Sequence, residues 1–225
     1  MSRFGLVVLA LMVPLVACAD TTQESVVQRL VDRSTLTVET IMTSPNSADV
    51  TSTLKNARAV MICPQVFKAG FILGGSGGGC VLVGRAAGGS WSAPAFYTIG
   101  SGSLGLQAGI EDASVMMMIM NDKALNAVIN SQFKIGADAS IAVATVGATI
   151  GGSTTAAMDA DIVTFAQNRG LFAGISLDGA LLSSDYSSDQ AYYGGKSDAR
   201  QIVIGMQANN PGANPLRAVL ARYGS

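Results

Sequence analysis

The chain contains no histidine among its 225 residues. This absence excludes a Ser-His-Asp triad, a Cys-His pair, histidine-ligated zinc and an imidazole base. Neighbouring carboxylates occur, but Glu111 and Asp112 would point to opposite faces of a strand, and Asp159 and Asp161 have no evident partner base. The residue pattern therefore predicts a protein that is not an enzyme and that uses no cofactor and no metal.

Charge is also scarce, because Asp, Glu, Lys and Arg make up 13% of the chain and the formal net charge is −1. A nucleic-acid-binding protein needs a concentrated basic surface, so nucleic acid is not an expected partner. The 26 glycines and the abundant aliphatic residues instead favour an ordered protein rich in β-structure.

A long hydrophobic run is the third missing feature. Residues 4–15 form an apolar run of about a dozen residues, whereas a membrane-spanning helix needs ~20. Arg3 precedes the run and Leu15-Val16-Ala17-Cys18 follows it, which is typical of a bacterial lipoprotein signal peptide. We expect cleavage after residue 17 and acylation of Cys18, the alternative being a secreted protein with an incidental cysteine. Two or more acyl chains would give durable membrane anchoring.

These features predict a signal peptide at residues 1–17, a lipidated and helical N-terminal segment at 18–56, and a binding domain at 57–225. Ala19, and not an aspartate, follows Cys18. Since an aspartate at that position retains lipoproteins in the inner membrane, we expect an exported protein anchored in the outer membrane and facing the periplasm.

The two remaining cysteines, Cys63 and Cys80, could be joined by a disulfide or could be free thiols. Export permits a disulfide between them, which would close a loop of about 16 residues and stabilise the fold by ~3 kcal/mol. Both also lie in apolar runs, where buried free thiols are common.

Periodicity and turn residues predict the elements. The capping pattern Thr21-x-x-Glu24 and an apolar stripe predict a helix over residues 20–43, which could pack on its own domain or lie on a membrane. Further helices are expected at residues 48–56, 123–129 and 214–223, and strands at 59–63, 70–73, 80–83, 96–110, 115–120, 133–151 and 162–183. The expected fold is a single α+β domain, dominated by a curved antiparallel sheet with N-terminal, middle and C-terminal helices packed on it.

Glycine-rich segments suggest ligand loops without fitting any. Residues 100–105 match G-x-G-x-x-G, but no helix pattern follows, so we interpret these glycines as strand positions. Residues 74–79 lack the Gly-Lys-Ser/Thr of a phosphate loop and are interpreted as a flexible hairpin tip. Asn168-Arg169-Gly170 and Asp178-Gly179 are the other expected turns.

Several blocks in a fixed order carry a resemblance to a known family. They are residues 57–64, 69–75, 77–83, 105–109 and 170–180, together with Gly89-Ser90-Trp91-Ser92-Ala93-Pro94 and Tyr192-Tyr193-Gly194. Over residues 54–194 their order and spacing resemble the SYLF lipid-binding domain. Phe165 departs from the usual tyrosine, and Asp189-Gln190-Ala191 stands where an arginine and an asparagine would be usual.

The resemblance implies a lipid-binding domain, found in eukaryotic adaptors that bind phosphoinositides such as phosphatidylinositol phosphates and, in some, actin filaments. Bacterial relatives are often exported lipoproteins, in agreement with Cys18. Candidate phospholipid contacts are the basic residues Lys68, Arg85, Lys123 and Lys134, with Trp91 either an interfacial anchor or a core residue.

The sequence therefore supports two functions of different kinds. The first is a membrane-anchored lipoprotein whose domain binds phospholipid without chemistry. The second is an envelope adaptor that binds a protein partner and touches the membrane only through its acyl chains.

Overall fold

The computed structural model describes residues 17–45, 47–70, 73–104, 109–130, 132–146, 160–169, 177, 179–195 and 197–225. Residues 1–16 of the signal peptide predicted at 1–17, and the side chain of Cys18, lie outside this description. The helices are α1 (Ala17–Met42), α2 (Ser47–Asn56), α3 (Asp122–Asn130), α5 (Tyr186–Tyr193), α6 (Ala199–Val203), the 3₁₀ helix η1 (Pro211–Ala213) and α7 (Asn214–Gly224).

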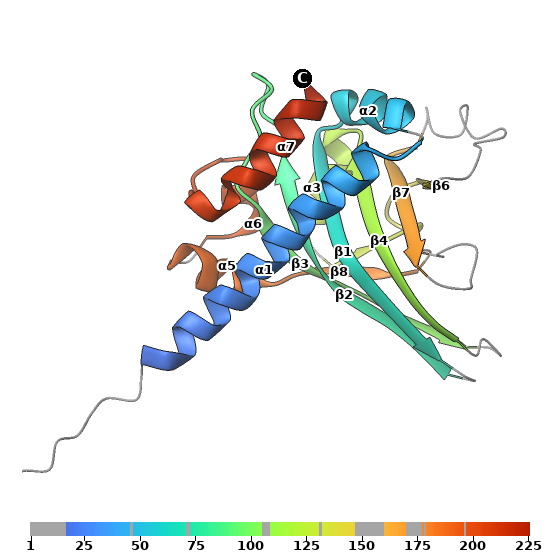
Figure 1. Cartoon of the computed structure of the whole chain (residues 1–225), viewed down its shortest axis with the longest axis horizontal. Coiled ribbons are helices and arrows are strands. Elements are labelled where there is room, and N and C mark those ends of the chain that lie inside the picture. The colour runs from blue at the N-terminus through green and yellow to red at the C-terminus, as the bar shows by residue number, and fades with distance from the viewer. Residues whose placement is uncertain are drawn as a thin grey trace, which may run out of the picture.

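The strands of the described residues form one eight-stranded sheet in the order β5-β8-β3-β2-β1-β4-β7-β6. Its members are β1 (Ala59–Gly70), β2 (Leu73–Gly84), β3 (Ala95–Leu104), β4 (Gly109–Ile119), β5 (Phe133–Lys134), β6 (Ile141–Thr145), β7 (Ile162–Arg169) and β8 (Leu181–Ser184). Neighbours run antiparallel except for the parallel pair β6 and β7. Figure 1 shows the sheet curling behind α1, with β1, β2 and β4 extending beyond the helices. The predicted α+β class and curved, mainly antiparallel sheet are confirmed.

Helix α1 lies across one face of this sheet, as Figure 1 shows. Its apolar stripe is buried, with Val27 2% exposed and Val31, Val38 and Ile41 fully buried. The stripe packs against Val60, Ile62, Met116 and Met118 of the sheet and against residues of α2 and α7. Of the two expectations for this helix, packing on its own domain is the one that the described residues show.

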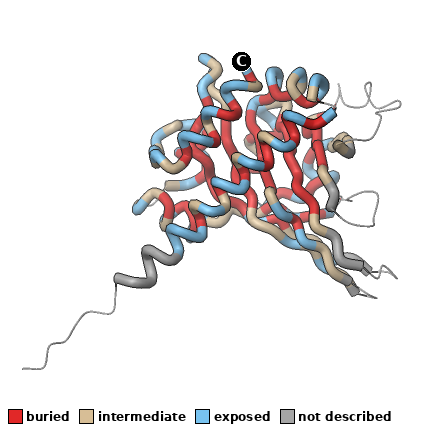
Figure 2. The backbone as a smooth tube through the Cα atoms, in the orientation of Figure 1, coloured by how far each residue is buried: buried red, intermediate tan, exposed pale blue. Residues whose placement is uncertain are grey.

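The opposite face of the sheet has its own apolar core. Alternate strand residues such as Met61, Leu82, Tyr97 and Met117 point to this face, where α3 and α6 cover them. Because successive side chains of a strand point to opposite faces, the apolar runs of β1, β2 and β4 serve both cores at once. Figure 2 shows the resulting band of buried strands between exposed helix surfaces.

The predicted end of the first strand at residue 63, just before Pro64, is wrong. β1 continues to Gly70, and its register against β4 shifts between Cys63 and Val66, which marks a bulge. Since proline cannot donate to a β-ladder, a bulge is where a strand tolerates one.

The prediction of a flexible tip at residues 74–79 is also wrong. These residues lie inside β2 and pair with β1 on one side and β3 on the other. Glycine is required here because a Cβ on Gly78 would lie 2.2 Å from the backbone oxygen of Gln65, at the bulge. The segment between β1 and β2, residues 71–72, lies outside the described residues.

Gly78→Ala is therefore expected to lower the free energy of unfolding by about 2 kcal/mol, because overpacking forces the bulge to move. Gly102→Ala in β3 is the matched control, since its Cβ would meet no atom within 4 Å. Chemical denaturation of both variants measures the difference. Equal stability of the two variants would show that the close approach of Gln65 does not require glycine at position 78.

The strands of the second half are shorter than predicted. Within residues 133–151 the structure forms β5 and β6, and within 162–183 it forms β7 and the start of β8, with residues 170–176 outside the description. Asn168 and Arg169 are not a turn, because they end β7 and pair with Ala113 and Asp112. Residues 100–104 are strand residues, as interpreted. Helices α5 and α6 and the 3₁₀ turn η1 were not predicted.

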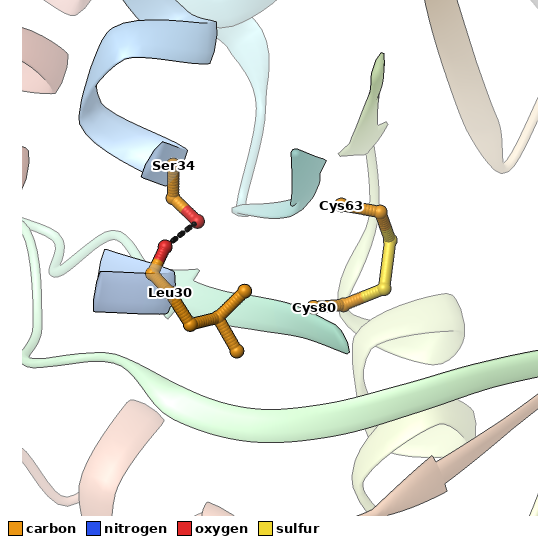
Figure 3. Close-up of a disulfide and its surroundings, with 4 residues drawn as sticks. All are labelled: Leu30, Ser34, Cys63 and Cys80. Atoms are coloured by element: carbon orange, nitrogen blue, oxygen red, sulfur yellow. Dashed lines mark hydrogen bonds between the residues drawn. A yellow bond between two sulfur atoms is a disulfide. The ribbon is translucent and has the colours of Figure 1, made fainter. Parts of the chain in front are cut away.

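A disulfide joins Cys63 of β1 to Cys80 of β2, with their Cα atoms 4.1 Å apart (Figure 3). Both cysteines are fully buried in the core on the face opposite α1. On the α1 side of the same strands, Leu30 packs against Gly79, where an added Cβ would lie 3.1 Å from Leu30 Cδ2. The bridge therefore fixes the pairing of β1 and β2 next to the bulge.

Among the described residues, every helix is too short or too polar to cross a membrane.

Candidate functional site

A basic cleft lies where β1 begins and β2 ends. It consists of two adjoining cavities of about 480 Å³ and about 200 Å³ that share Arg58, Arg85, Ala86 and Ala87 as lining. The larger cavity is closed by α3 and α6, and the smaller one by the last turn of α2. We call this feature the basic cleft after four of its lining residues, Lys55, Arg58, Arg85 and Arg200.

Arg85 holds the floor of the basic cleft. Its guanidinium donates to the backbone oxygens of Lys55 at the end of α2 and of Gly224 at the end of α7. It also lies over the ring of Trp91, 5.5 Å from the centroid. Because the carbonyl end of a helix carries partial negative charge, one cation here ties two helix ends together.

The walls of the basic cleft carry the other cations. Arg200 of α6 donates to Asn126 Oδ1 at 2.9 Å and to Asn130 Oδ1 at 2.7 Å, which fixes its side chain against α3. Arg58 makes a loose ion pair with Asp122, 3.7 Å from Nε to Oδ1, and both side chains are more than half exposed. Such an exposed pair contributes little, so Arg58 is available to another anion.

The charge balance of the basic cleft favours an anionic ligand. Its lining carries four cations and one carboxylate, Asp122. Apolar side chains stand beside the cations, since Ile204 is 44% exposed and Met206 lines the same cavity. A phosphate group with an attached hydrocarbon portion matches this combination of cations and exposed apolar surface.

The predicted contacts do not all meet at this site. Arg85 lies in it, and Lys123 is an exposed neighbour of Asp122 on α3. Lys68 lies nine residues along β1 from Ala59, about 30 Å away, and Lys134 lies on the sheet-edge strand β5. The sequence reasoning missed Lys55, Arg58 and Arg200, because nothing in their spacing shows that α2, β1 and α6 end at one place.

Two roles were expected for Trp91, and the structure shows the core residue. Trp91 is 2% exposed and packs in the core shared by α1, α2 and α7, so it is not an interfacial anchor in this structure. The Trp91 ring lies beneath the guanidinium of Arg85, and this guanidinium binds the ends of α2 and α7. Gly224 packs on it closely, where an added Cβ would lie 3.1 Å from the ring.

A second cavity of about 300 Å³ lies between α1 and the bulge of β1. Arg33 donates to Gln65 at 3.2 Å, and Gln65 donates to Asp112 at 2.9 Å. The cation and the carboxylate are thus linked through the amide, and this cavity offers no excess charge of either sign.

Asp189 is the most unusual titratable residue of the described chain. It lies fully buried in α5, where Oδ1 accepts the backbone N–H of Phe96 at 3.0 Å and Oδ2 has no partner. Burial raises the pKa of Asp189 to about 7; the hydrogen bond from Phe96 opposes this, and Asp185 and Asp198 add to it. It holds α5 on β3 and does not line the basic cleft.

Across the described residues, no three His, Cys, Asp or Glu side chains are grouped so as to hold a metal ion. The site is thus a surface cleft that can bind and orient an anion, and its described residues include no nucleophile paired with a base. The fold and the site together define an α+β module whose described residues form a basic surface cleft.

Comparison with known proteins identifies the module. Residues 100–223 match the family model Ysc84, described as Las17-binding protein actin regulator, and the chain belongs to this family. The resemblance to the SYLF domain drawn from the sequence is thereby confirmed. The family description names a binding protein and no reaction.

Eukaryotic relatives match over much of this chain. SH3 domain-containing YSC84-like protein 1 is 32% identical over 141 residues in Xenopus laevis, covering 62% of this chain and 42% of the relative. In Homo sapiens the protein of that name is 29% identical over 160 residues, covering 71% and 47%. LAS seventeen-binding protein 3 of Saccharomyces cerevisiae is 28% identical over 172 residues, covering 74% and 37%. The chain spans less than half the length of these relatives.

Proposed function

We propose that this protein is a membrane-anchored lipoprotein whose domain binds anionic phospholipid without catalysing a reaction. The observation that carries the proposal is the basic cleft, where four cations and one carboxylate line a cavity beside exposed apolar side chains. The lipobox ending at Cys18 supports the anchor and an exported location, in the outer membrane facing the periplasm.

The basic cleft suits a lipid phosphate in two ways. Arg58 and Lys55 are exposed and can donate to phosphate oxygens, while Arg85 is held by backbone carbonyls and supplies a fixed positive charge. Ile204 and Met206 can contact the glycerol and the start of the acyl chains. Each cation near an anionic surface contributes about 1 kcal/mol.

Flotation on liposomes tests the proposal. Residues 19–225, which keep every described side-chain contact of the core from Val27 onward, are expected to float with vesicles containing phosphatidylglycerol or a phosphatidylinositol phosphate. Binding is expected to fade as salt is raised. Lys55→Gln with Arg58→Gln is expected to weaken it by about 2 kcal/mol, roughly 30-fold.

The matched control is Arg29→Gln with Arg33→Gln, which removes the same charge from exposed sites of α1 outside the basic cleft. This variant is expected to bind like the unchanged protein. Equal loss in both variants would mean that net charge, and not the cleft, attracts the membrane. Absence of flotation on every vesicle would overturn the proposal.

The names of the relatives favour a second candidate, an adaptor that binds a protein partner. The yeast relative is named for binding LAS seventeen, and the matched family for binding Las17. For this chain the partner would be an envelope protein, and the acyl anchor would supply all membrane contact. A partner that co-purifies with the acylated protein, together with no flotation of residues 19–225, would establish it.

A further inference from the structure

The position of the basic cleft relative to the proposed anchor carries a further inference, which rests on the proposed function. Helix α1 begins at Ala17, so Cys18 stands in its first turn with no linker between the anchor and the helix. Figure 1 shows this end of α1 projecting away from the sheet. Among the α1 side chains that the structure describes, from Gln23 onward, the first buried one is Val27.

The basic cleft lies at the other end of the molecule. Gln28 of α1 donates to the backbone oxygen of Gly212, just before α7 begins, whereas the end of α7 at Gly224 is bound by Arg85 of the cleft. Both helices rise toward the end that carries α2 (Figure 1). At 1.5 Å per residue, the turns of α1 before Gln28 and the length of α7 place the cleft about 30 Å from Cys18.

The larger cavity of the cleft has its walls on the face of the sheet opposite α1, since Leu125 of α3 and Val203 of α6 belong to the core on that far face. The smaller cavity lies against the last turn of α2, on the same side of the sheet as α1. Helices α1, α2 and α7 belong to the core on the near face. The sheet therefore separates the two sides.

Neither of two resting positions on the anchoring membrane brings both cavities of the cleft to the lipids of that membrane. With α1 upright, the cleft stands about 30 Å above the bilayer, beyond the ~8–10 Å reach of surface charges at physiological salt. With α1 lying flat, the sheet stands between the bilayer and the larger cavity, so Arg200 and the apolar side chains of Ile204 and Met206 face away from that bilayer.

We infer that the basic cleft binds phospholipid phosphates of a second membrane, opposite the one that holds Cys18, so that the protein bridges two lipid surfaces. The anchor fixes one end of α1, and the basic cleft at the far end captures the other surface by charge. Ile204 and Met206, which line the larger cavity, contact the hydrocarbon part of the captured lipid.

Vesicle capture tests the inference with the full acylated chain. The protein, with acylation of Cys18 verified by mass, is reconstituted into labelled phosphatidylcholine vesicles. These are mixed with differently labelled acceptor vesicles of phosphatidylcholine or of phosphatidylcholine with phosphatidylglycerol. Two-colour fluorescence correlation counts joined pairs. We expect capture of anionic acceptors, reversed by salt, at least tenfold weaker with Lys55→Gln and Arg58→Gln, and unchanged with Arg29→Gln and Arg33→Gln.

Adding anionic lipid to the anchoring vesicle tests which of the two membranes the basic cleft binds. When phosphatidylglycerol is added to the anchoring vesicle as well, capture of anionic acceptors is expected to persist. If it stops, the cleft has bound its own membrane, and the inference is overturned. If residues 19–225 float on anionic vesicles but the anchored chain captures none, bridging fails while the proposed lipid binding stands. If neither occurs, both fail, and absence of acylation overturns bridging by itself.

Discussion

Between pH 4 and pH 8 the free energy of unfolding is expected to fall by about 4 kcal/mol because of one side chain, Asp189. The folded protein holds the pKa of this carboxyl at about 7, against 3.8 for the ordinary group. The folded state therefore keeps a proton that the unfolded chain releases between these two pH values. Since a shift of one pKa unit is worth about 1.4 kcal/mol, stability is full below pH 3.8 and is lost by pH 7.

The cause is geometric. Asp189 is fully buried, its Oδ2 has no partner, and the charged groups that affect its pKa most, Asp185 and Asp198, are themselves acidic. An ionised carboxylate in this place lacks both water and a cation. Ionisation should therefore loosen α5 from β3 before the rest of the sheet.

Asp189→Asn tests this expectation, because the amide oxygen can still accept the N–H of Phe96. We expect the variant to lose the stability slope between pH 4 and pH 7 and to exceed the unchanged protein in stability at pH 8. Urea denaturation across this range measures both. Asp185 is the internal control: burial would raise its pKa, but hydrogen bonds from Ser187 and Ser188 hold it below 3.8, so it titrates outside the range. Parallel pH profiles for variant and parent would contradict the prediction.

Loss of the Cys63–Cys80 disulfide is expected to lower the free energy of unfolding by about 3 kcal/mol. The bridge spans 17 positions and constrains the unfolded chain by closing that loop. It also joins two strands at the bulge, where the ladder between β1 and β2 is interrupted between Ile62 and Phe67. Reduction therefore removes a constraint at the point where the backbone pairing is weakest.

The comparison is between the oxidised chain and the same chain refolded under reducing conditions. The urea midpoint is expected to fall by about 1 M. Cys63→Ala with Cys80→Ala is the control, and its midpoint should not respond to reductant. An unchanged midpoint in the reduced parent would show that packing of the buried sulfurs, and not the covalent bond, holds the two strands.

Sequence patterns predicted most of the helices and strands that depend on neighbouring residues, such as an apolar stripe or a capping residue. The stripe from Val27 to Ile41 predicted α1, and Asn121, whose Oδ1 accepts the N–H of Ala124 at 2.8 Å, marked the start of α3. They failed where pairing overrides propensity. Six consecutive residues of glycine and serine read as a turn, yet β1 and β3 hold them as a strand because Gly78 must approach Gln65. The short helices α5 and α6 have too few apolar residues to show a period.

The kind of protein follows from the amino-acid sequence alone. Absent histidine, low charge and the SYLF-like blocks exclude or indicate whole classes of protein without any knowledge of the fold, and the motif ending at Cys18 led to the prediction of a lipid anchor. Only the tertiary structure decided the site. Lys55, Arg58, Arg85 and Arg200 come from α2, β1, β2 and α6, and they meet because the sheet brings the ends of these elements together. Burial of Trp91 and the separation of the basic cleft from Cys18 were settled in the same way, because long-range packing leaves no local signal in the chain.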